Sequence, residues 1–267
     1  MRSLTACSQN PHDLETAAFT KFLACVVSLG LSSFAFFTSF LLKHFKGSIN
    51  VMIHGIILSD FCYSLFAILL YKLNIHTQEL CNVIASVETY ARISSFTWSA
   101  CFAHALVSAF DIQDPGTFKI RVRWYCFLSL FIPLFFAVYL NIIEYYQPYI
   151  LPSGVSVCSH NFAGDSFDLQ MFTLYSLPLT LVFLYTAGCF FLAIAKMRGG
   201  GSRELLTLLI YPIITILCWS PYLPYQVMSE RCLDVPEWLR NIAAIFSGLP
   251  GSFHSLLYVF SYADETQ

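Results

Sequence analysis

Charged side chains are scarce in this chain. Asp, Glu, Lys and Arg make up 11% of its 267 residues, against about 25% in an ordinary soluble domain. This scarcity excludes a disordered chain, a nucleic-acid binder with a basic face and almost any water-soluble enzyme. The sequence contains no Asn-x-Ser/Thr site and no myristoylation pattern. A cleavable signal peptide is also not expected, because an acidic segment precedes a first apolar run that is too long.

The few charges are bunched, and long apolar stretches separate them. About 20 helical residues cross a bilayer, and seven stretches reach that length. They cover residues 22–42, 49–71, 81–110, 124–143, 169–195, 205–229 and 241–262. Barrel strands alternate in polarity over about 10 residues, whereas these stretches are apolar all round. The sequence therefore predicts an all-α membrane protein, a seven-transmembrane helix bundle.

The basic residues predict how the bundle is oriented. The loops after the first, third and fifth spans hold eight Lys and Arg residues, and the other side holds five. By the positive-inside rule the N-terminus lies outside and the C-terminus is cytoplasmic. We expect residues 1–21 to form a short extracellular tail and residues 263–267 a truncated cytoplasmic tail. Gly199–Ser202 resembles an engineered linker, so we expect that a native loop was shortened there.

Cysteine placement agrees with this orientation. Six of the ten cysteines lie within the predicted spans. The other four, Cys7, Cys81, Cys158 and Cys232, all fall on the predicted outer side, where disulfides form. Four cysteines allow three pairings. We favour Cys81 with Cys158 and Cys7 with Cys232. The first pair would tie the third span to the long loop over residues 144–168, which is the natural lid over an outward-facing pocket.

Ionisable side chains within a span are costly and mark functional sites by default. Asp60 lies in the middle of the second span. It is expected to be either a hydrogen-bonded structural acid or a site for sodium or a proton. Glu88 and Arg92 lie four residues apart in the third span, on one helix face, in the order that favours an ion pair. They are expected to form a structural salt bridge, the polar floor of an outward pocket, or both.

Prolines predict kinks in the last two spans. Pro221 follows Trp219 by two residues, and Pro250 lies between Gly248 and Gly251. A proline within a helix removes a backbone hydrogen bond and bends the helix. Such kinks suit a helix bundle that changes between two arrangements. In many membrane proteins, however, kinks have the structural role of shaping helix packing and no other.

At this point the chain resembles a G-protein-coupled receptor over nearly its whole length. Cys218–Pro221 matches the helix-6 motif of rhodopsin-like receptors, and Leu58–Asp60 resembles their sodium-coordinating helix-2 acid. Pro250–Phe253 is similar to a degraded Asn-Pro-x-x-Tyr motif of helix 7. Ser95–Phe102 is closer to the cyclic-AMP-receptor-like and ocular-albinism-type groups. No Asp-Arg-Tyr ends the third span, so the arginine that this family uses at the G-protein interface is missing.

The resemblance implies a set of functional residues. Trp219 would be the activation toggle, and Glu88 would face the ligand pocket. The predicted ligand-binding residues are Glu88, Arg92, Trp219, Tyr222 and Tyr225, with the lid around Cys158. The predicted switch residues are Trp219, Pro221 and Pro250. A basic loop with Lys119, Arg121 and Arg123 would face a cytoplasmic partner or anionic lipid.

The expected function is a plasma-membrane receptor that binds an extracellular small molecule or short peptide and signals to a heterotrimeric G protein or arrestin. We expect no enzymatic activity, no nucleic-acid partner and no cofactor other than sodium near Asp60. An intracellular organelle membrane is the alternative location. The predicted outer segments carry nine acids and five bases, so the entrance should slightly repel anions. The last span has no lysine, which excludes a retinal Schiff base there.

Two other functions stay open. A seven-helix zinc hydrolase of the ceramidase-like kind would use histidines and an acid with a metal-bound water. His54, Asp60, His104 and His254 are its candidate residues. A transporter or channel would instead line a path with Asp60, Glu88 and Arg92.

Overall fold

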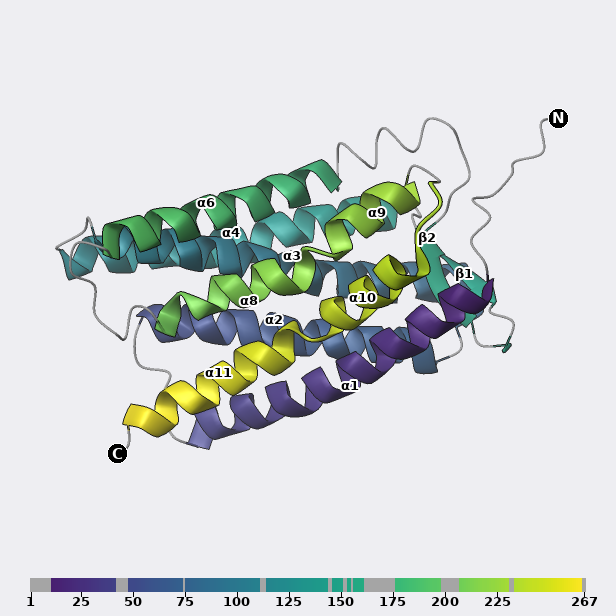
Figure 1. Cartoon of the computed structure of the whole chain (residues 1–267), viewed down its shortest axis with the longest axis horizontal. Helices are drawn as coiled ribbons and strands as arrows, with labels where there is room; N and C mark the ends of the chain where they lie inside the picture. The colour runs from purple at the N-terminus through teal and green to yellow at the C-terminus, as the bar shows by residue number, and fades with distance from the viewer. Residues whose placement is uncertain are drawn as a thin grey trace.

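The structure is a computed structural model that describes ten segments of the chain. These are residues 11–41, 48–73, 75–110, 114–143, 146–150, 153–154, 156–160, 176–197, 207–230 and 233–265. The described part is helical apart from one short hairpin (Figure 1). Its elements are α1 (Pro11–Leu41), α2 (Ser48–Lys72), α3 (Gln78–Ala109), α4 (Pro115–Ile142), β1 (Tyr146–Ile150), β2 (Ser156–His160), α6 (Leu177–Met197), α8 (Ile210–Trp219), α9 (Tyr222–Glu230), α10 (Glu237–Gly248) and α11 (Pro250–Glu265).

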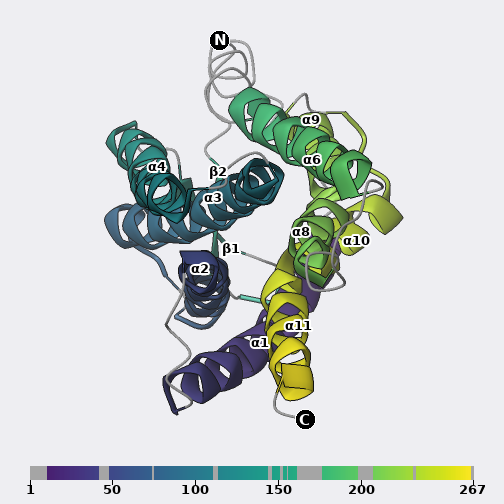
Figure 2. The same cartoon turned by 90° about the vertical axis from the view of Figure 1, so that its left-hand side faces the viewer.

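The helices run side by side along the long axis of the molecule (Figure 1). Helix α1 begins at the end that carries the hairpin, and α11 ends at the opposite end. Seen end-on, α3 lies among α2, α4 and α6 (Figure 2), and it packs against all three. Most of its side chains are therefore buried, including the charged Glu88 and Arg92. A helix surrounded by protein can carry polar residues because other helices supply their hydrogen-bond partners.

Within the segments that the structure describes, four helices are long and apolar enough to cross a membrane: α1, α2, α4 and α6. The number rises to five if α10 and α11, which are bent by 41° at their junction, form one span. The prediction of a helical protein with several candidate membrane spans is thus confirmed, whereas the count of seven stays a prediction. Helix α3 is more polar, and α8 and α9 are separate short helices.

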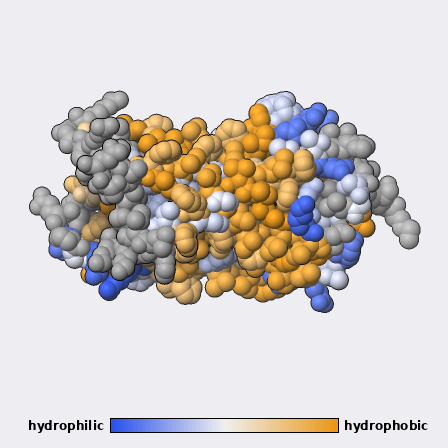
Figure 3. Space-filling view, turned by 90° about the horizontal axis from the view of Figure 1, so that it is seen from below, coloured by the Kyte–Doolittle hydropathy of each residue, from blue (hydrophilic) through white to orange (hydrophobic). Residues whose placement is uncertain are grey.

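The outer surface of the bundle is apolar. Phe135, Phe191 and Phe260 are each 67% or 68% exposed. Figure 3 shows a broad hydrophobic band around the middle of one face, with hydrophilic residues gathered toward the two ends. Soluble monomers rarely expose contiguous apolar patches larger than a few hundred Å². The band therefore matches a surface that lipid covers.

Several helices extend beyond the apolar runs that predict them. Helix α1 begins at Pro11, so half of the expected outer tail is helical. Helix α4 begins at Pro115, because the Asp114 side chain accepts hydrogen bonds from the backbone N–H groups of Gly116 and Thr117 at 3.1 and 2.9 Å. The basic residues expected in a loop therefore lie exposed on α4, at the end opposite the hairpin (Figure 1). They are Lys119, Arg121 and Arg123.

The kinks expected at two prolines are present. The sixth predicted span is interrupted at Ser220 and Pro221, where α8 ends and α9 begins. The seventh is interrupted at Leu249, and α11 begins at Pro250 with the 41° bend. Gly248, at the end of α10, lies so close to α1 that an added Cβ would come within 2.6 Å of the Ala24 Cβ.

The long loop contains an antiparallel hairpin that the sequence did not predict. Strand β1 pairs with β2 so that Pro148 lies opposite Cys158. The sulfur atoms of Cys158 and Cys81 lie at disulfide-bonding distance, with Cα atoms 5.6 Å apart, as the favoured pairing requires. This bond ties β2 to the beginning of α3. Cys7, Cys232 and Gly199–Ser202 lie outside the described residues.

Candidate ligand-binding site

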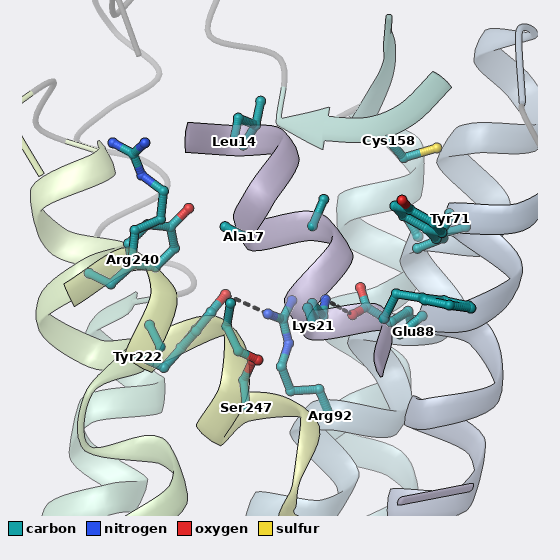
Figure 4. Close-up of a pocket in the computed structure, with 18 of the residues that line it drawn as sticks. Leu14, Ala17, Lys21, Tyr71, Glu88, Arg92, Cys158, Tyr222, Arg240 and Ser247 are labelled. Atoms are coloured by element: carbon teal, nitrogen blue, oxygen red, sulfur yellow. Dashed lines mark hydrogen bonds and ion pairs between the residues drawn. The ribbon is translucent and has the colours of Figure 1, made fainter. Parts of the chain in front are cut away.

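A cavity of about 220 Å³ lies at the hairpin end of the bundle. Residues of α1, α2, α3, α9, α10 and the hairpin line it (Figure 4). Its walls combine small and apolar residues with polar side chains. The charged lining residues are Lys21, Glu88, Arg92 and Arg240, and the lining tyrosines are Tyr71, Tyr146, Tyr222 and Tyr225. Of the predicted ligand-binding residues, four line the cavity, namely Glu88, Arg92, Tyr222 and Tyr225.

Glu88 forms its ion pair across the cavity with a residue of α1. The Nζ atom of Lys21 lies 2.8 Å from Oε1 of Glu88. This differs from the expected pairing of Glu88 with Arg92. The guanidinium of Arg92 instead donates to the hydroxyl of Tyr222 at 2.5 Å and to that of Thr89 at 3.2 Å. Sequence spacing places Glu88 and Arg92 on one face of α3, but it cannot tell which neighbouring helices supply nearer partners.

Arg92 connects α3 to the kink between α8 and α9. Its guanidinium carbon lies 5.3 Å from the centre of the Tyr222 ring, within cation–π range. Tyr222 is the first residue of α9, directly after Pro221. Only 4% of Arg92 is exposed. Arg92 thus forms the floor of the cavity. Its buried cation lies against the first turn of α9, which follows the break at Pro221.

Tyr146 is a residue of strand β1 through which the hairpin lines the cavity. Its hydroxyl forms a hydrogen bond with Thr89, and its backbone N–H donates to Oδ1 of Asn82 at 3.3 Å. Burial raises the pKa of the Tyr146 phenol well above its ordinary value. Cys158 lines the cavity as well. The predicted role of this loop as a lid therefore agrees with the position of its described residues.

Sequence reasoning missed several lining residues. Lys21 and Arg240 were assigned to outer segments because each flanks an apolar run, yet both lie on helices that extend past those runs. Gln226 and Ser247 were also missed. The sequence feature that could have identified Lys21 and Arg240 is a basic side chain within one or two turns of the end of a predicted span. The helices of Lys21 and Arg240 continue past the apolar runs, and both side chains line the cavity.

Trp219 does not line the cavity but packs directly beneath it. Its ring lies 5.3 Å from Tyr222, 4.7 Å from Phe96 and 5.8 Å from Tyr63, measured between centroids. The indole is 1% exposed, and its Nε1 has no hydrogen-bond partner among the described residues. Tyr63 and Phe96 both pack against Trp219. These three side chains are called the aromatic layer below.

A polar network around Asp60 lies next to the aromatic layer. Oδ1 of Asp60 accepts a hydrogen bond from Ser95 at 2.6 Å, and Oδ2 lies 2.6 Å from Nδ1 of His254. Nε2 of His254 lies 3.2 Å from the backbone carbonyl of Tyr211 and 3.4 Å from the hydroxyl of Thr215. Residues from α2, α3, α8 and α11 thus meet at Asp60.

The residues proposed for a zinc site do not converge. His54 lies 2.6 Å from the backbone carbonyl of Asn50, and His104 lies 3.0 Å from the hydroxyl of Tyr125. Among the residues that the structure describes, no three His, Cys, Asp or Glu side chains are grouped so that they could hold a metal ion. Of the four candidate residues, only Asp60 and His254 contact each other.

Comparison of the sequence with protein-family models and with curated proteins yields no match.

Proposed function

We propose that the chain is a plasma-membrane receptor of the G-protein-coupled kind. In this proposal seven helices cross the membrane, with α8–α9 and α10–α11 as two kinked spans and the N-terminus outside. The cavity beneath the hairpin binds an extracellular small molecule or short peptide. The opposite end, which carries Lys119, Arg121 and Arg123 exposed on α4, contacts a G protein or arrestin.

The observation that carries the proposal is the position of Tyr222. It lines the cavity, contacts Arg92 and Trp219, and begins α9 directly after the break at Pro221. A ligand that touches Tyr222 therefore acts on the residues at which the helix changes direction. If the ligand binds one arrangement of α8 and α9 more tightly than another, it shifts the population between them.

The packing beneath the cavity supports a receptor over a channel. A transport path would have to connect Glu88 and Arg92 with Asp60. The aromatic layer packs beside both groups, and Tyr63, Phe96 and Trp219 are each at most 2% exposed. A closely packed layer transmits a displacement from one side to the other, whereas it blocks the passage of a solute.

A G-protein dissociation screen in cells tests the proposal. Libraries of extracellular metabolites and short peptides are applied to cells that express the chain with each G-protein class. We expect at least one compound to dissociate one class. The Lys119→Gln/Arg121→Gln/Arg123→Gln variant should lose the response, whereas Lys72→Gln, which removes an exposed base at the cavity end, should keep it. A solute flux in liposomes together with no response from any G-protein class would contradict the receptor proposal.

Trp219→Phe is the informative variant for the toggle. Alanine at this buried position would remove about 3–5 kcal/mol of stability, so folding and signalling would change together. Phenylalanine keeps an aromatic ring and leaves no hydrogen bond unmade, because Nε1 of Trp219 has no partner among the described residues. We expect normal surface expression with at least a threefold change in the concentration of ligand that gives half-maximal response. An unchanged response would exclude Trp219 from the switch.

A further inference from the structure

Tyr146 is the residue through which the hairpin reaches the floor of the cavity. Its side chain comes from β1 and lines the cavity. Its backbone N–H donates to Asn82 of α3, and its hydroxyl forms a hydrogen bond with Thr89, which lies about two helical turns further along the same helix. The chain thus places one of its own phenol rings beside the floor of the cavity.

The backbone of Tyr146 is fixed to the beginning of α3. The side-chain amide of Gln78 donates to the Tyr146 carbonyl, and Oδ1 of Asn82 accepts from the Tyr146 N–H. The Cys81–Cys158 pair ties the second strand of the hairpin to the same part of α3. These contacts set the position of the phenol in advance, so little conformational entropy is lost when its hydroxyl binds Thr89.

From Thr89 a series of hydrogen bonds continues to the break between α8 and α9. One Nη atom of Arg92 donates to the Thr89 hydroxyl at 3.2 Å, and the other donates to the hydroxyl of Tyr222 (Figure 4). Tyr222 begins α9, and the N–H of Tyr225 donates across the break to the carbonyl of Pro221 at 3.4 Å. Side-chain hydrogen bonds thus join β1 to the first turn of α9. The four side chains are called the hairpin relay below, and they are Tyr146, Thr89, Arg92 and Tyr222.

The hairpin relay is buried, which makes its hydrogen bonds costly to break. Thr89, Tyr146 and Arg92 are each at most 4% exposed. A buried polar group that loses its partner bears the full cost of its desolvation, so a shift of one member of the relay favours a shift of the next. Coupling between distant elements requires such a contiguous chain of contacts and an element that can adopt two arrangements. The break at Pro221 supplies the second requirement.

We propose that Tyr146 is a built-in ligand of the cavity, whose phenol holds the first turn of α9 through Thr89 and Arg92. An external ligand that displaces the phenol or moves the hairpin then releases this turn. The consequence for signalling rests on the proposed function. The coupling between the hairpin and α9 does not, because it is measured on the purified chain without a G protein.

Hydrogen exchange of the purified chain in lipid nanodiscs tests the coupling. Tyr146→Phe keeps the ring and removes the hydroxyl, and we expect exchange in the peptide over residues 222–230 to become at least threefold faster. Thr89→Val removes the middle of the hairpin relay at nearly constant volume and should act in the same way. Because both variants interrupt one chain of contacts, the double variant should exchange no faster than the faster single variant.

Tyr71→Phe is the matched control for these variants. Tyr71 lines the same cavity but is not a member of the hairpin relay, so the loss of its hydroxyl should leave exchange in residues 222–230 unchanged. If Tyr146 had a structural role alone, Tyr146→Phe would speed exchange in the hairpin but not beyond the break at Pro221. Unchanged exchange in residues 222–230 of Tyr146→Phe, or the same increase in Tyr71→Phe, would overturn the inference.

A rescue experiment separates a ligand-like role of Tyr146 from its contribution to packing. Tyr146→Ala vacates the space of the phenol ring, and engineered cavities in proteins bind small aromatic molecules. Added phenol should therefore restore slow exchange in residues 222–230 saturably, whereas benzene, which has no hydroxyl, should not. Equal rescue by benzene, or no rescue by phenol, would contradict the proposed role of the hydroxyl. If Tyr146→Ala does not fold, Tyr146→Phe and Thr89→Val still decide the matter.

A measurement in cells connects the coupling to signalling. Tyr146→Phe should change the ligand-independent G-protein response at least twofold, and Tyr71→Phe should not. Coupling in the purified chain with no G-protein response in any variant would contradict the receptor proposal and leave the hairpin relay standing.

Discussion

Nδ1 of His254 lies 2.6 Å from Oδ2 of Asp60, and Nε2 of the same ring faces the backbone carbonyl of Tyr211 at 3.2 Å. The imidazole of His254 thus links the carboxyl group of Asp60 in α2 to the backbone of α8.

These contacts bear on the sodium ion expected near Asp60. One carboxyl oxygen of Asp60 lies against His254, and the other accepts a hydrogen bond from Ser95. A cation would therefore have to compete with His254 and Ser95 for the acid.

Replacing one partner of this pair should be far more damaging than replacing both. His254→Leu leaves the Asp60 acid buried without its partner, and we expect a loss of about 3–5 kcal/mol in the free energy of unfolding. Asp60→Asn/His254→Leu removes the charge as well, so its loss should be clearly smaller than the sum of the two single losses. Unfolding in mixed micelles with a denaturing detergent measures these differences.

His104→Gln is the matched control for this cycle. His104 makes its hydrogen bond with Tyr125 and is only partly buried, so its replacement should cost less than His254→Leu. Additive losses for Asp60 and His254 would mean that the two side chains do not stabilise each other.

Much of the bundle was predictable because burial in lipid leaves a strong pattern. Apolar runs predicted the helices, and the prolines at 221 and 250 predicted their kinks. The side on which the cysteines fall left three pairings open, and the favoured Cys81–Cys158 pair is the one at bonding distance. Helix ends were less predictable: Asp114 and Pro115 extend α4 beyond its apolar run through local capping that hydropathy does not register.

The residues of the site were easier to predict than the contacts that they make. Glu88 and Arg92 were identified because charge within an apolar run is conspicuous. Their contacts, Lys21 and Tyr222, come from helices 67 and 130 residues away in sequence. Asp60 and His254 are likewise 194 residues apart. Such pairs depend on how helices pack around α3, and one sequence contains no direct record of that packing.

The close approach of α1 and α10 predicts that residue 248 must be glycine. An alanine Cβ there would come within 2.6 Å of the Ala24 Cβ and 3.3 Å of the backbone of Lys21 and Cys25, none of which can rotate away. We expect Gly248→Ala to lower the free energy of unfolding by about 1–3 kcal/mol. Because Lys21 and Ser247 line the cavity beside this contact, ligand affinity should fall as well.

Two other helical glycines provide the control. An added Cβ at Gly30 or Gly188 meets no other atom within 4 Å. Alanine has the higher helix propensity, so Gly30→Ala and Gly188→Ala should leave stability unchanged or raise it by up to about 1 kcal/mol. Equal losses in all three variants, in the same micelle assay, would show that the α1–α10 contact is not the cause.

The cap of α4 gives a prediction about pH. Hydrogen bonds from the side chain and backbone of Thr117, and from the backbone of Gly116, hold the pKa of the Asp114 carboxyl below its ordinary value of about 3.9. A lowered pKa in the folded state means that the ionised carboxylate stabilises the first turn above the ordinary pKa and that this stabilisation is lost as pH falls through the folded value. Hydrogen-exchange protection of the first turn of α4, corrected for intrinsic rates, should thus be constant from pH 7 to about pH 5 and decline only at lower pH.

Asp114→Asn keeps an acceptor oxygen but does not titrate, so its protection should not show this decline. Asp114→Ala should reduce protection at every pH, because no side chain then accepts from Gly116 and Thr117. A decline of the same size in the Asn variant would assign the pH dependence to another group.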